Sequence, residues 1–171
     1  GIIFLGMSRY LSFESLKLPA NPLVIILETV EKPGNLGAVL RTCDAAGVDL
    51  LIICDPETDI YNPNVIRSGI GCVFTQKVLA CSSDQAISWL RENNITIFAA
   101  ALQTDELYHN TDFTGPSAIV FGTESTGLTE KWLRAADKII KIPMLGTIDS
   151  LNVSNSVAII VFEAKRQRGF A

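Results

Sequence analysis

Short runs of consecutive apolar residues alternate along the chain with segments in which apolar residues recur at helical spacing. Leu23–Leu27 and Leu50–Cys54 are apolar throughout, which is typical of strands buried on both faces of a sheet. Shorter or more mixed runs predict further strands at Val78–Ala80, Ile95–Ala101, Ser117–Phe121 and Lys138–Ile142.

The helical segments alternate with these strands. They lie at Ala38–Ala46, Val65–Ser68, Ser83–Asn93, Thr129–Ala136 and Asn152–Arg168. Ser83 and Thr129 are expected to cap the helices that they begin, because a hydroxyl oxygen can accept a hydrogen bond from a free amide of the first turn. Apolar strands that alternate with helices predict an α/β fold, a parallel sheet with helices on both faces. Such sheets bind ligands at the carboxyl ends of their strands.

Composition narrows the class of protein. The 171 residues leave room for one domain with a full core, and 48% apolar against 19% charged residues exclude a disordered tail or linker. The net charge of −4 excludes a strongly basic nucleic-acid coat protein but not a locally basic site. No apolar run is long enough to cross a bilayer, and no basic segment precedes the apolar residues 1–7. We therefore expect neither a membrane span nor a signal peptide.

Cysteine and histidine usage predicts no metal site. The four cysteines form no C-x-x-C pair and lie in mostly apolar surroundings, which indicates reduced thiols in a cytoplasmic protein. The single histidine, His109, has neither the spacing of a zinc site nor that of a Ser-His-Asp triad.

Three loops at predicted strand ends are richer in glycine and small polar residues than a connection needs: Glu28–Arg41, Gly122–Leu128 and Pro143–Asn152. In the first, Gly34 and Gly37 allow a tight turn, and Asn35 is expected to cap a helix whose N-terminus favours an anion. The glycine fingerprints G-x-G-x-x-G and G-x-x-x-x-G-K-[ST] are both absent.

Arg41 stands inside an otherwise apolar helix. An arginine in such a place needs a partner or a ligand, and Asp44 and Glu28 are the partners that the sequence offers. The helix alone leaves a structural ion pair and a functional role equally open.

The second and third loops each have a structural explanation when taken alone. Two glycines flank Glu124, and an ordinary glycine turn with a solvated carboxylate explains this loop best. Ser150, Asn152 and Ser154 crowd the start of an apolar helix, where residues of this kind serve as N-caps. Capping explains one of the three but not their occurrence together with Pro143-Met144 and Gly146.

Taken in order, the three loops resemble the signature motifs of the SpoU (TrmH-like) branch of the SPOUT RNA methyltransferases. The matching positions of the first motif are Asn35, Gly37 and Arg41. Those of the second are Gly122, Glu124, Gly127 and Leu128. Those of the third are Ile142, Pro143, Met144, Gly146, Ser150, Leu151, Asn152 and Val153. The segment from Asn62 to Gly69 also resembles this branch, so the likeness spans roughly residues 23–168.

The resemblance implies a fold whose C-terminal part is threaded into a deep trefoil knot, which general topology rules would argue against. It implies a cofactor, S-adenosylmethionine, held in a bent form largely by backbone groups. By position, the cofactor-binding residues are Leu102, Gly122, Ile142, Met144 and Leu151. It further implies methylation of a ribose 2′-hydroxyl in RNA, by a homodimer without a metal.

The resemblance also assigns catalytic residues. Arg41 is the proposed activator of the ribose hydroxyl. Because the pKa of an arginine is normally above ~12, electrostatic stabilisation of a forming alkoxide is easier to defend than a role as base. Asn35 would orient the nucleotide or Arg41, and the residues that hold this constellation are Glu124, Ser150 and Asn152.

The substrate and the extent of the domain are further expectations. Ribosomal RNA is the first choice and transfer RNA the second. More distant alternatives are a nucleotide- or flavin-binding doubly wound domain and a catalytically silent RNA-binding module. Residues 1–22 are interpreted as a lead-in or linker from an N-terminal RNA-recognition domain, and residues 23–171 as the methyltransferase domain. The expected site is basic only locally, around Arg41, Arg67 and Arg9.

Overall fold

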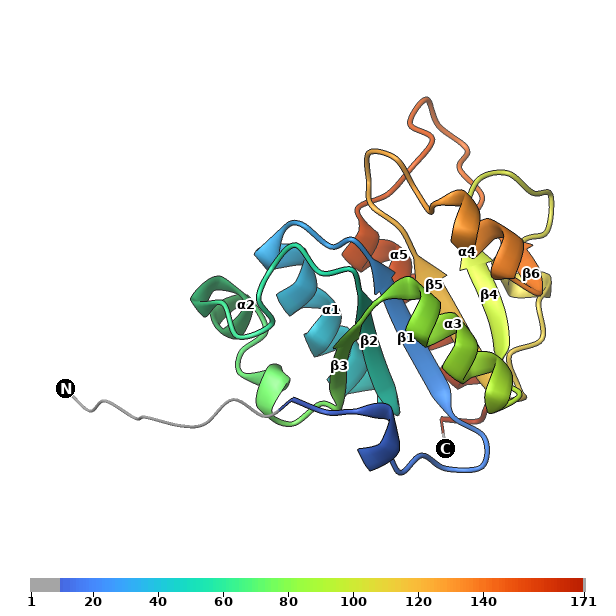
Figure 1. The fold of residues 1–171 in the computed structure, drawn as a ribbon. Coiled ribbons are helices and arrows are strands. Elements are labelled where there is room, and N and C mark those ends of the chain that lie inside the picture. Colours follow the sequence, from blue (N-terminus) through green and yellow to red (C-terminus); the bar gives the residue numbers. More distant parts are fainter. Residues whose placement is uncertain (1–9, 171) are drawn as a thin grey trace.

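The computed structural model of the protein describes residues 10–170, which leaves Arg9 and the first part of the lead-in outside the described residues. Its centre is a six-stranded sheet in the order β3-β2-β1-β5-β4-β6, and every neighbouring pair is parallel (Figure 1). The strands are β1 Leu23–Glu28, β2 Leu50–Cys54, β3 Val78–Cys81, β4 Thr96–Ala100, β5 Ser117–Phe121 and β6 Lys138–Ile140. The predicted parallel sheet is confirmed.

Within residues 10–170, five helices cover the sheet on both faces, as the sequence predicts (Figure 1). They are α1 Pro33–Ala46, α2 Pro63–Ser68, α3 Ser83–Glu92, α4 Glu130–Ala135 and α5 Val153–Gln167. Helices α1, α2 and α5 lie over one face, and α3 and α4 over the other. Single 3-10 turns form at η1 Phe13–Ser15, η2 Cys72–Phe74 and η3 Tyr108–Asn110. None of the helices in the described residues has the length and apolar character needed to cross a membrane.

Strand β1 shows why these runs become central strands. All six of its residues are buried, and successive side chains point to opposite faces of the sheet. Ile25 packs in the cluster under α1 and α5, whereas Ile26 packs in the cluster under α3 and α4. A run without polar positions is therefore what a strand covered on both faces requires.

The N-cap of α3 differs from the prediction by one residue. Ser82 is the N-cap and accepts a hydrogen bond from Gln85 N, so the expectation that Ser83 is the cap is wrong. The Ser83 hydroxyl is buried and is used elsewhere: it accepts from Trp132 Nε1 at 3.0 Å and donates to Asp55 Oδ2 at 2.6 Å. A tertiary contact therefore takes the hydroxyl that the sequence assigned to the helix end.

The described part of the lead-in lies against the domain. Phe13 stacks on Trp89 with ring centroids 5.0 Å apart, and Leu11, Leu16 and Leu18 pack against the cluster under α3 and α4. Residues 10–22 thus add to the core of one face.

The strands are added to the sheet on one side of β1 and then on the other, so the order of addition changes sides between β1 and β5 although the two strands are parallel. The chain proceeds outward from β1 to β2 and β3, and then fills the other half of the sheet with β4, β5 and β6. Ligands of open parallel sheets bind outside the carboxyl ends of the strands at such a point. The loops that follow β1 and β5 leave the sheet there.

Candidate active site

The loop after β5 is a tight turn that depends on its first glycine. Thr123 pairs with Gly127, whose amide donates to Thr123 O at 3.0 Å and whose φ of +69° is in the left-handed region. A Cβ atom added to Gly122 would lie 2.2 Å from the carbonyl carbon of Gly127. Only glycine permits this approach, and the turn presents Glu124 at the edge of the sheet.

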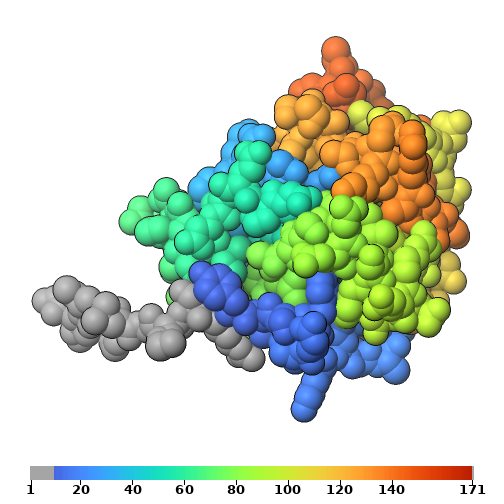
Figure 2. Space-filling view, in the orientation of Figure 1, coloured from blue at the N-terminus to red at the C-terminus, as the bar shows by residue number. Residues whose placement is uncertain are grey.

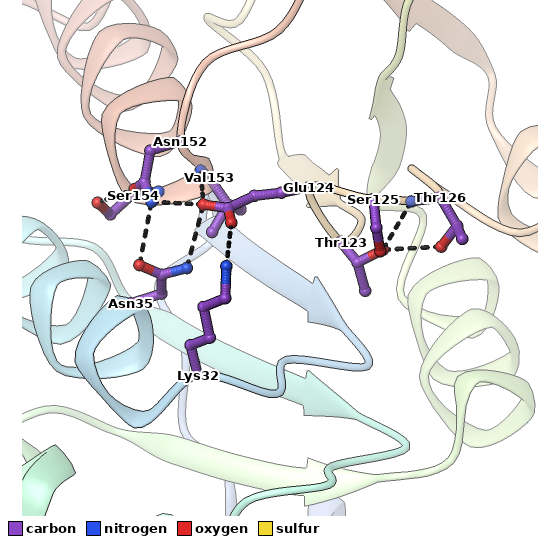
Figure 3. Close-up of polar contacts among 9 residues, drawn as sticks. All are labelled: Lys32, Asn35, Thr123, Glu124, Ser125, Thr126, Asn152, Val153 and Ser154. Carbon is purple, nitrogen blue, oxygen red and sulfur yellow. Dashed lines mark hydrogen bonds and ion pairs between the residues drawn. The ribbon is translucent and has the colours of Figure 1, made fainter.

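Glu124 is the centre of a network that joins all three motif loops (Figure 3). Its Oε1 accepts hydrogen bonds from Asn35 Nδ2 at 3.2 Å, from Val153 N at 3.3 Å and from Asn152 Nδ2. Asn152 Nδ2 also donates to Asn35 Oδ1 at 3.1 Å. Residues from three distant parts of the chain are therefore held as one polar unit.

A lysine supplies the charge that balances Glu124. Lys32 Nζ lies 2.8 Å from Glu124 Oε2, and the side chains are 67% and 27% exposed, respectively. The hydrogen bond from Lys32, together with those from Val153 N and Asn35, lowers the pKa of Glu124, and Glu124 in turn raises the pKa of Lys32. Glu124 is thus an ionised acceptor at neutral pH.

The helix starts explain how the two asparagines reach Glu124. Helix α1 begins at Pro33 with Lys32 as N-cap, so the expectation that Asn35 caps this helix is wrong. Proline has a fixed φ suited to the first helical position, which leaves Asn35 in the first turn with its amide free for Glu124. Asn152 is the N-cap of α5, because its Oδ1 accepts from Ser154 N at 3.0 Å.

A cavity of about 370 Å³ lies beside this network, over the carboxyl ends of β4, β5 and β6. Its lining includes all five residues expected to bind the cofactor: Leu102, Gly122, Ile142, Met144 and Leu151. Ser150 and Glu124 also line it. The cavity has the size of a small-molecule site, and its mixture of apolar side chains and a few polar groups suits S-adenosylmethionine.

One wall of this cavity is a segment with free backbone groups. Met144 and Asp149 to Leu151 line the cavity, and within the described residues the backbone of residues 143–151 forms no hydrogen bond with another backbone group. Shortly before this segment, Lys141 forms a parallel bridge with Leu107: its amide donates to Glu106 O, and its carbonyl accepts from Tyr108 N. Strand β6 therefore ends at Ile140 rather than at Ile142, because pairing with β4 stops at Ile140 and Lys141 pairs with Leu107, and Ile142 lines the cavity.

A second, smaller cavity of about 130 Å³ adjoins the first between β1 and β5, where the order of addition changes sides. Glu28, Lys32 and Asn35 line it, and Glu124 lines both cavities. The polar network therefore stands between a site for a cofactor-sized molecule and a site for a smaller group.

Comparison with known proteins identifies the family. The family model of the SpoU rRNA Methylase family matches residues 22–162. The chain belongs to the SpoU methylase family. Similar proteins include the tRNA (guanosine(18)-2′-O)-methyltransferase of Thermus thermophilus, 42% identical over 85% of this chain and 75% of that protein. The 23S rRNA (guanosine-2′-O-)-methyltransferase RlmB of Escherichia coli K12 is 34% identical over 86% of this chain and 61% of that protein.

Solved structures agree with this assignment to the SpoU family. The SpoU methyltransferase AviRb from Streptomyces viridochromogenes, in complex with AdoMet, aligns with a TM-score of 0.89 at 27% identity, over 95% of this chain and 67% of that one. An RNA 2′-O ribose methyltransferase aligns with a TM-score of 0.86 at 39% identity, over 92% of this chain and 60% of that one. This SpoU chain thus spans about 60% of the length of several relatives.

Arg41 of this SpoU chain lies apart from the Glu124 network. It is six residues beyond Asn35, about 9 Å farther along α1, and its side chain is exposed. In the described part of the chain it pairs with neither expected partner: Glu28 accepts from Thr129 N and Oγ1, and Asp44 accepts from Thr75 Oγ1. The guanidinium is therefore available to a ligand.

The sequence did not indicate the contacts of Lys32 and of the Val153 amide with Glu124, although Val153 is a position of the third motif. Lys32 and the Val153 amide both bind Glu124, from 92 and 29 positions away. No local pattern links them to a glutamate at such separations, although the proline after Lys32 marks the start of a helix. Among residues 10–170, no group of three or more potential metal ligands is found.

Proposed function

We propose that this chain is the catalytic domain of an RNA ribose 2′-O-methyltransferase that uses S-adenosylmethionine. The observation that carries the proposal is the Glu124 network, which unites the three motif loops beside a cofactor-sized cavity lined by the five expected residues. The Thermus and Escherichia coli relatives are both named as RNA 2′-O-methyltransferases, and the structure of the neighbour AviRb contains AdoMet.

The cofactor would be held by the lining of the larger cavity. Apolar side chains such as Leu102 and Met144 suit a purine ring, and the free backbone groups of residues 143–151 suit its polar edge. When bound, S-adenosylmethionine supplies an electrophilic methyl group on a positively charged sulfur.

The residues of the chain would prepare the ribose hydroxyl, a poor nucleophile that must lose its proton during attack. Arg41 would stabilise the negative charge that develops on the 2′-oxygen, since a fixed cation contributes most where charge forms. Glu124 is a poor candidate for the base, because Lys32 lowers its pKa. We assign Glu124 and Asn152 to positioning.

Of the two asparagines in the network, Asn35 is the one with hydrogen-bonding capacity left for a substrate. Its Nδ2 donates to Glu124 and its Oδ1 accepts from Asn152, which leaves one N–H and one lone pair. Asn152 uses both ends of its amide within the protein, because its Oδ1 also accepts from Ser154. We therefore expect Asn35 to contact the target nucleotide, and Ser150 to shape the cavity in which the methyl group lies.

We propose that the C-terminal part is knotted. Lys141 forms a parallel bridge with Leu107, inside the connection from β4 to β5, so the chain that leaves β6 runs beside that connection, and this proximity supports such a path. After this bridge the chain continues to α5, which packs against α1 over one face of the sheet. A crystal structure with a trace that pulls open into a simple chain would contradict the knot.

We also propose a homodimer in the cytoplasm, with residues 23–171 as the methyltransferase domain and residues 1–22 as its lead-in. Helix α5 buries Val157, Ile160 and Val161 against the sheet but leaves Phe162 43% exposed on its outer side, where a second copy can pack. The four cysteines are free thiols, in keeping with a reducing compartment.

Ribosomal RNA is our first choice of substrate and transfer RNA the second. The family description and the RlmB relatives favour the first, and the 42% identity to the Thermus tRNA enzyme favours the second. The test is incubation with tritiated S-adenosylmethionine and unmodified rRNA or tRNA transcripts, followed by mapping of the methylated ribose. Cofactor binding without label in either RNA would overturn the proposed activity.

A further inference from the structure

Three aromatic rings form a cluster near α2, from the segments before and after this helix and from the lead-in. Tyr10 and Tyr61 meet edge to face with centroids 5.8 Å apart, and Tyr61 and Phe74 lie 6.0 Å apart at 30°. Tyr10 is 69% and Phe74 65% exposed. Clustered rings that face water mark a surface that another molecule covers.

The turn after α2 adds an exposed and strained side chain to this cluster. Ile70 has a φ of +51°, in the left-handed region that a β-branched residue rarely adopts, and its side chain is among the exposed hydrophobic ones at 72%. Hydrogen bonds hold the turn, from Ile70 N to Arg67 O and from Gly71 N to Ile66 O. Strain of this kind is concentrated at functional surfaces.

The same region contains arginines without acidic partners. These are Arg41 and Arg67. The other four arginines of residues 10–170 have protein partners: Arg91, Arg134 and Arg166 form ion pairs, and Arg168 donates to backbone carbonyls. Arg41 and Arg67 are exposed, and neither forms an ion pair within residues 10–170.

The two arginines lie on adjoining elements. Helix α1, which carries Arg41, packs so closely on α2 that a Cβ atom at Gly37 would lie 1.9 Å from Ser68 Oγ. Helix α1 also packs on η2: Asp44, three residues beyond Arg41, accepts a hydrogen bond from Thr75 Oγ1 at the end of η2 at 3.0 Å. Figures 1 and 2 show α2 projecting from the edge of the molecule, outside α1.

We propose that this surface, the α2 face of Tyr10, Tyr61, Arg67, Ile70 and Phe74, binds a single-stranded segment of the RNA substrate by base stacking. The proposal rests on the proposed function. Aromatic rings and guanidinium planes are the groups on which unpaired bases stack, and arginines without carboxylate partners complement phosphate. Arg41 borders the face, so a strand bound there would lead toward the residue assigned to the ribose hydroxyl.

A second copy of the chain is the competing occupant of the α2 face. It is less favoured, because α5 already offers Phe162 to a second copy and α1 separates α5 from α2. The unpaired arginines also complement a polyanion better than an identical surface.

The test compares Phe74→Leu, Tyr10→Leu and Arg67→Gln with matched controls. Phe170→Leu removes a ring of equal exposure outside the face, 64% against 65%, and Arg134→Gln removes an arginine whose side chain is 82% exposed. Phe74→Tyr is the conservative variant, because it keeps an aromatic ring at this position. The readouts are the KM for unmodified transcript at several salt concentrations and the fluorescence of 2-aminopurine in a single-stranded RNA, which is quenched by stacking.

We expect Phe74→Leu to raise KM about tenfold and to abolish quenching, while Phe74→Tyr retains both. Arg67→Gln should reduce the slope of log affinity against log salt by about 1. The control variants should match wild type, and all variants should bind S-adenosylmethionine normally. Equal KM and quenching in Phe74→Leu and Phe170→Leu would overturn the proposal. If Phe74→Leu instead lost self-association and kept its affinity for RNA, the α2 face would bind a second copy of the chain, which would also overturn the proposal. Quenching requires no methyl transfer, so failure of the proposed activity would be recognised separately.

Discussion

Lys32 Nζ lies 2.8 Å from Glu124 Oε2, and this ion pair joins the loop after β1 to the loop after β5 across 92 positions. The other carboxylate oxygen, Oε1, is the one that accepts hydrogen bonds from Asn35 and Asn152. The two oxygens of Glu124 therefore have separate tasks, one in charge balance and one in orientation.

Replacing Glu124 with Gln should lower kcat about a hundredfold, because a small displacement of positioned groups has effects of this size. The neutral amide keeps the shape but presents only one acceptor to the donors now bound by Glu124. Single-turnover methyl transfer measures the effect. Lys32→Gln is the matched control: it removes an exposed ion pair, typically worth ~0–1 kcal/mol, and should retain most of the activity. Equal losses in the two variants would contradict separate tasks for the oxygens.

Arg41→Ala should reduce methyl transfer about 10²- to 10³-fold, the usual effect of removing one group that stabilises developing negative charge. Affinity for S-adenosylmethionine should stay unchanged, because Arg41 is absent from the lining of the larger cavity. Calorimetric titration of the cofactor and tritium transfer to RNA measure the two quantities. Full activity in this variant would refute the assignment.

Gly122→Ala should weaken cofactor binding and lower the free energy of unfolding by about 1–3 kcal/mol, since the new methyl group has no room. Its Cβ would lie 2.2 Å from the carbonyl oxygen of Gly127 and 2.4 Å from Leu128 N. Gly146→Ala is the control, because no heavy atom lies within 4 Å of its added Cβ. Urea denaturation and cofactor titration distinguish them, and similar behaviour of both variants would show that the turn tolerates a side chain.

Glu163→Gln should change how stability depends on pH. Hydrogen bonds from Arg166 and Gln167, with the charge of Arg166, lower the pKa of Glu163 from 4.5 to about 2. A lowered carboxyl pKa stabilises the folded state above pH 4.5, and this stabilisation is lost as the pH falls toward 2. The wild type should therefore lose more stability than Glu163→Gln in urea titrations between these pH values. Parallel curves would rule out this contribution.

Phe162→Glu should convert the proposed dimer into a monomer, because a carboxylate in an apolar interface loses its hydration without a partner. Sedimentation velocity measures the change. Phe170→Glu is the control, since Phe170 is 64% exposed beyond the end of α5. A wild type that sediments as a monomer would contradict the dimer itself.

Much of the fold could be predicted from local patterns. Runs such as Leu23–Leu27 have no polar side to face water, and their shortness and β-branched residues favour strands covered on both faces. Helix starts were less predictable. Ser82 and Ser83 can both cap α3, and the choice depends on the buried contact of Ser83 with Trp132, 49 positions away.

The candidate site was predictable to the extent that its residues occur in motifs. Asn35, Glu124 and Asn152 stand in three recognisable loops, and the structure brings their side chains into contact. The contribution of Lys32 depends on the distance between two loops, which no periodicity encodes. Asn35 was misread as a cap because Pro33, the signal for the first helical position, stands two residues earlier.

The unbonded backbone of residues 143–151 has a thermodynamic consequence for cofactor affinity. A wall without backbone hydrogen bonds of its own keeps conformational entropy that ligand binding must remove. The measured affinity is then the intrinsic contact energy less this ordering term, so substitutions that stiffen the wall can tighten binding without adding a single contact.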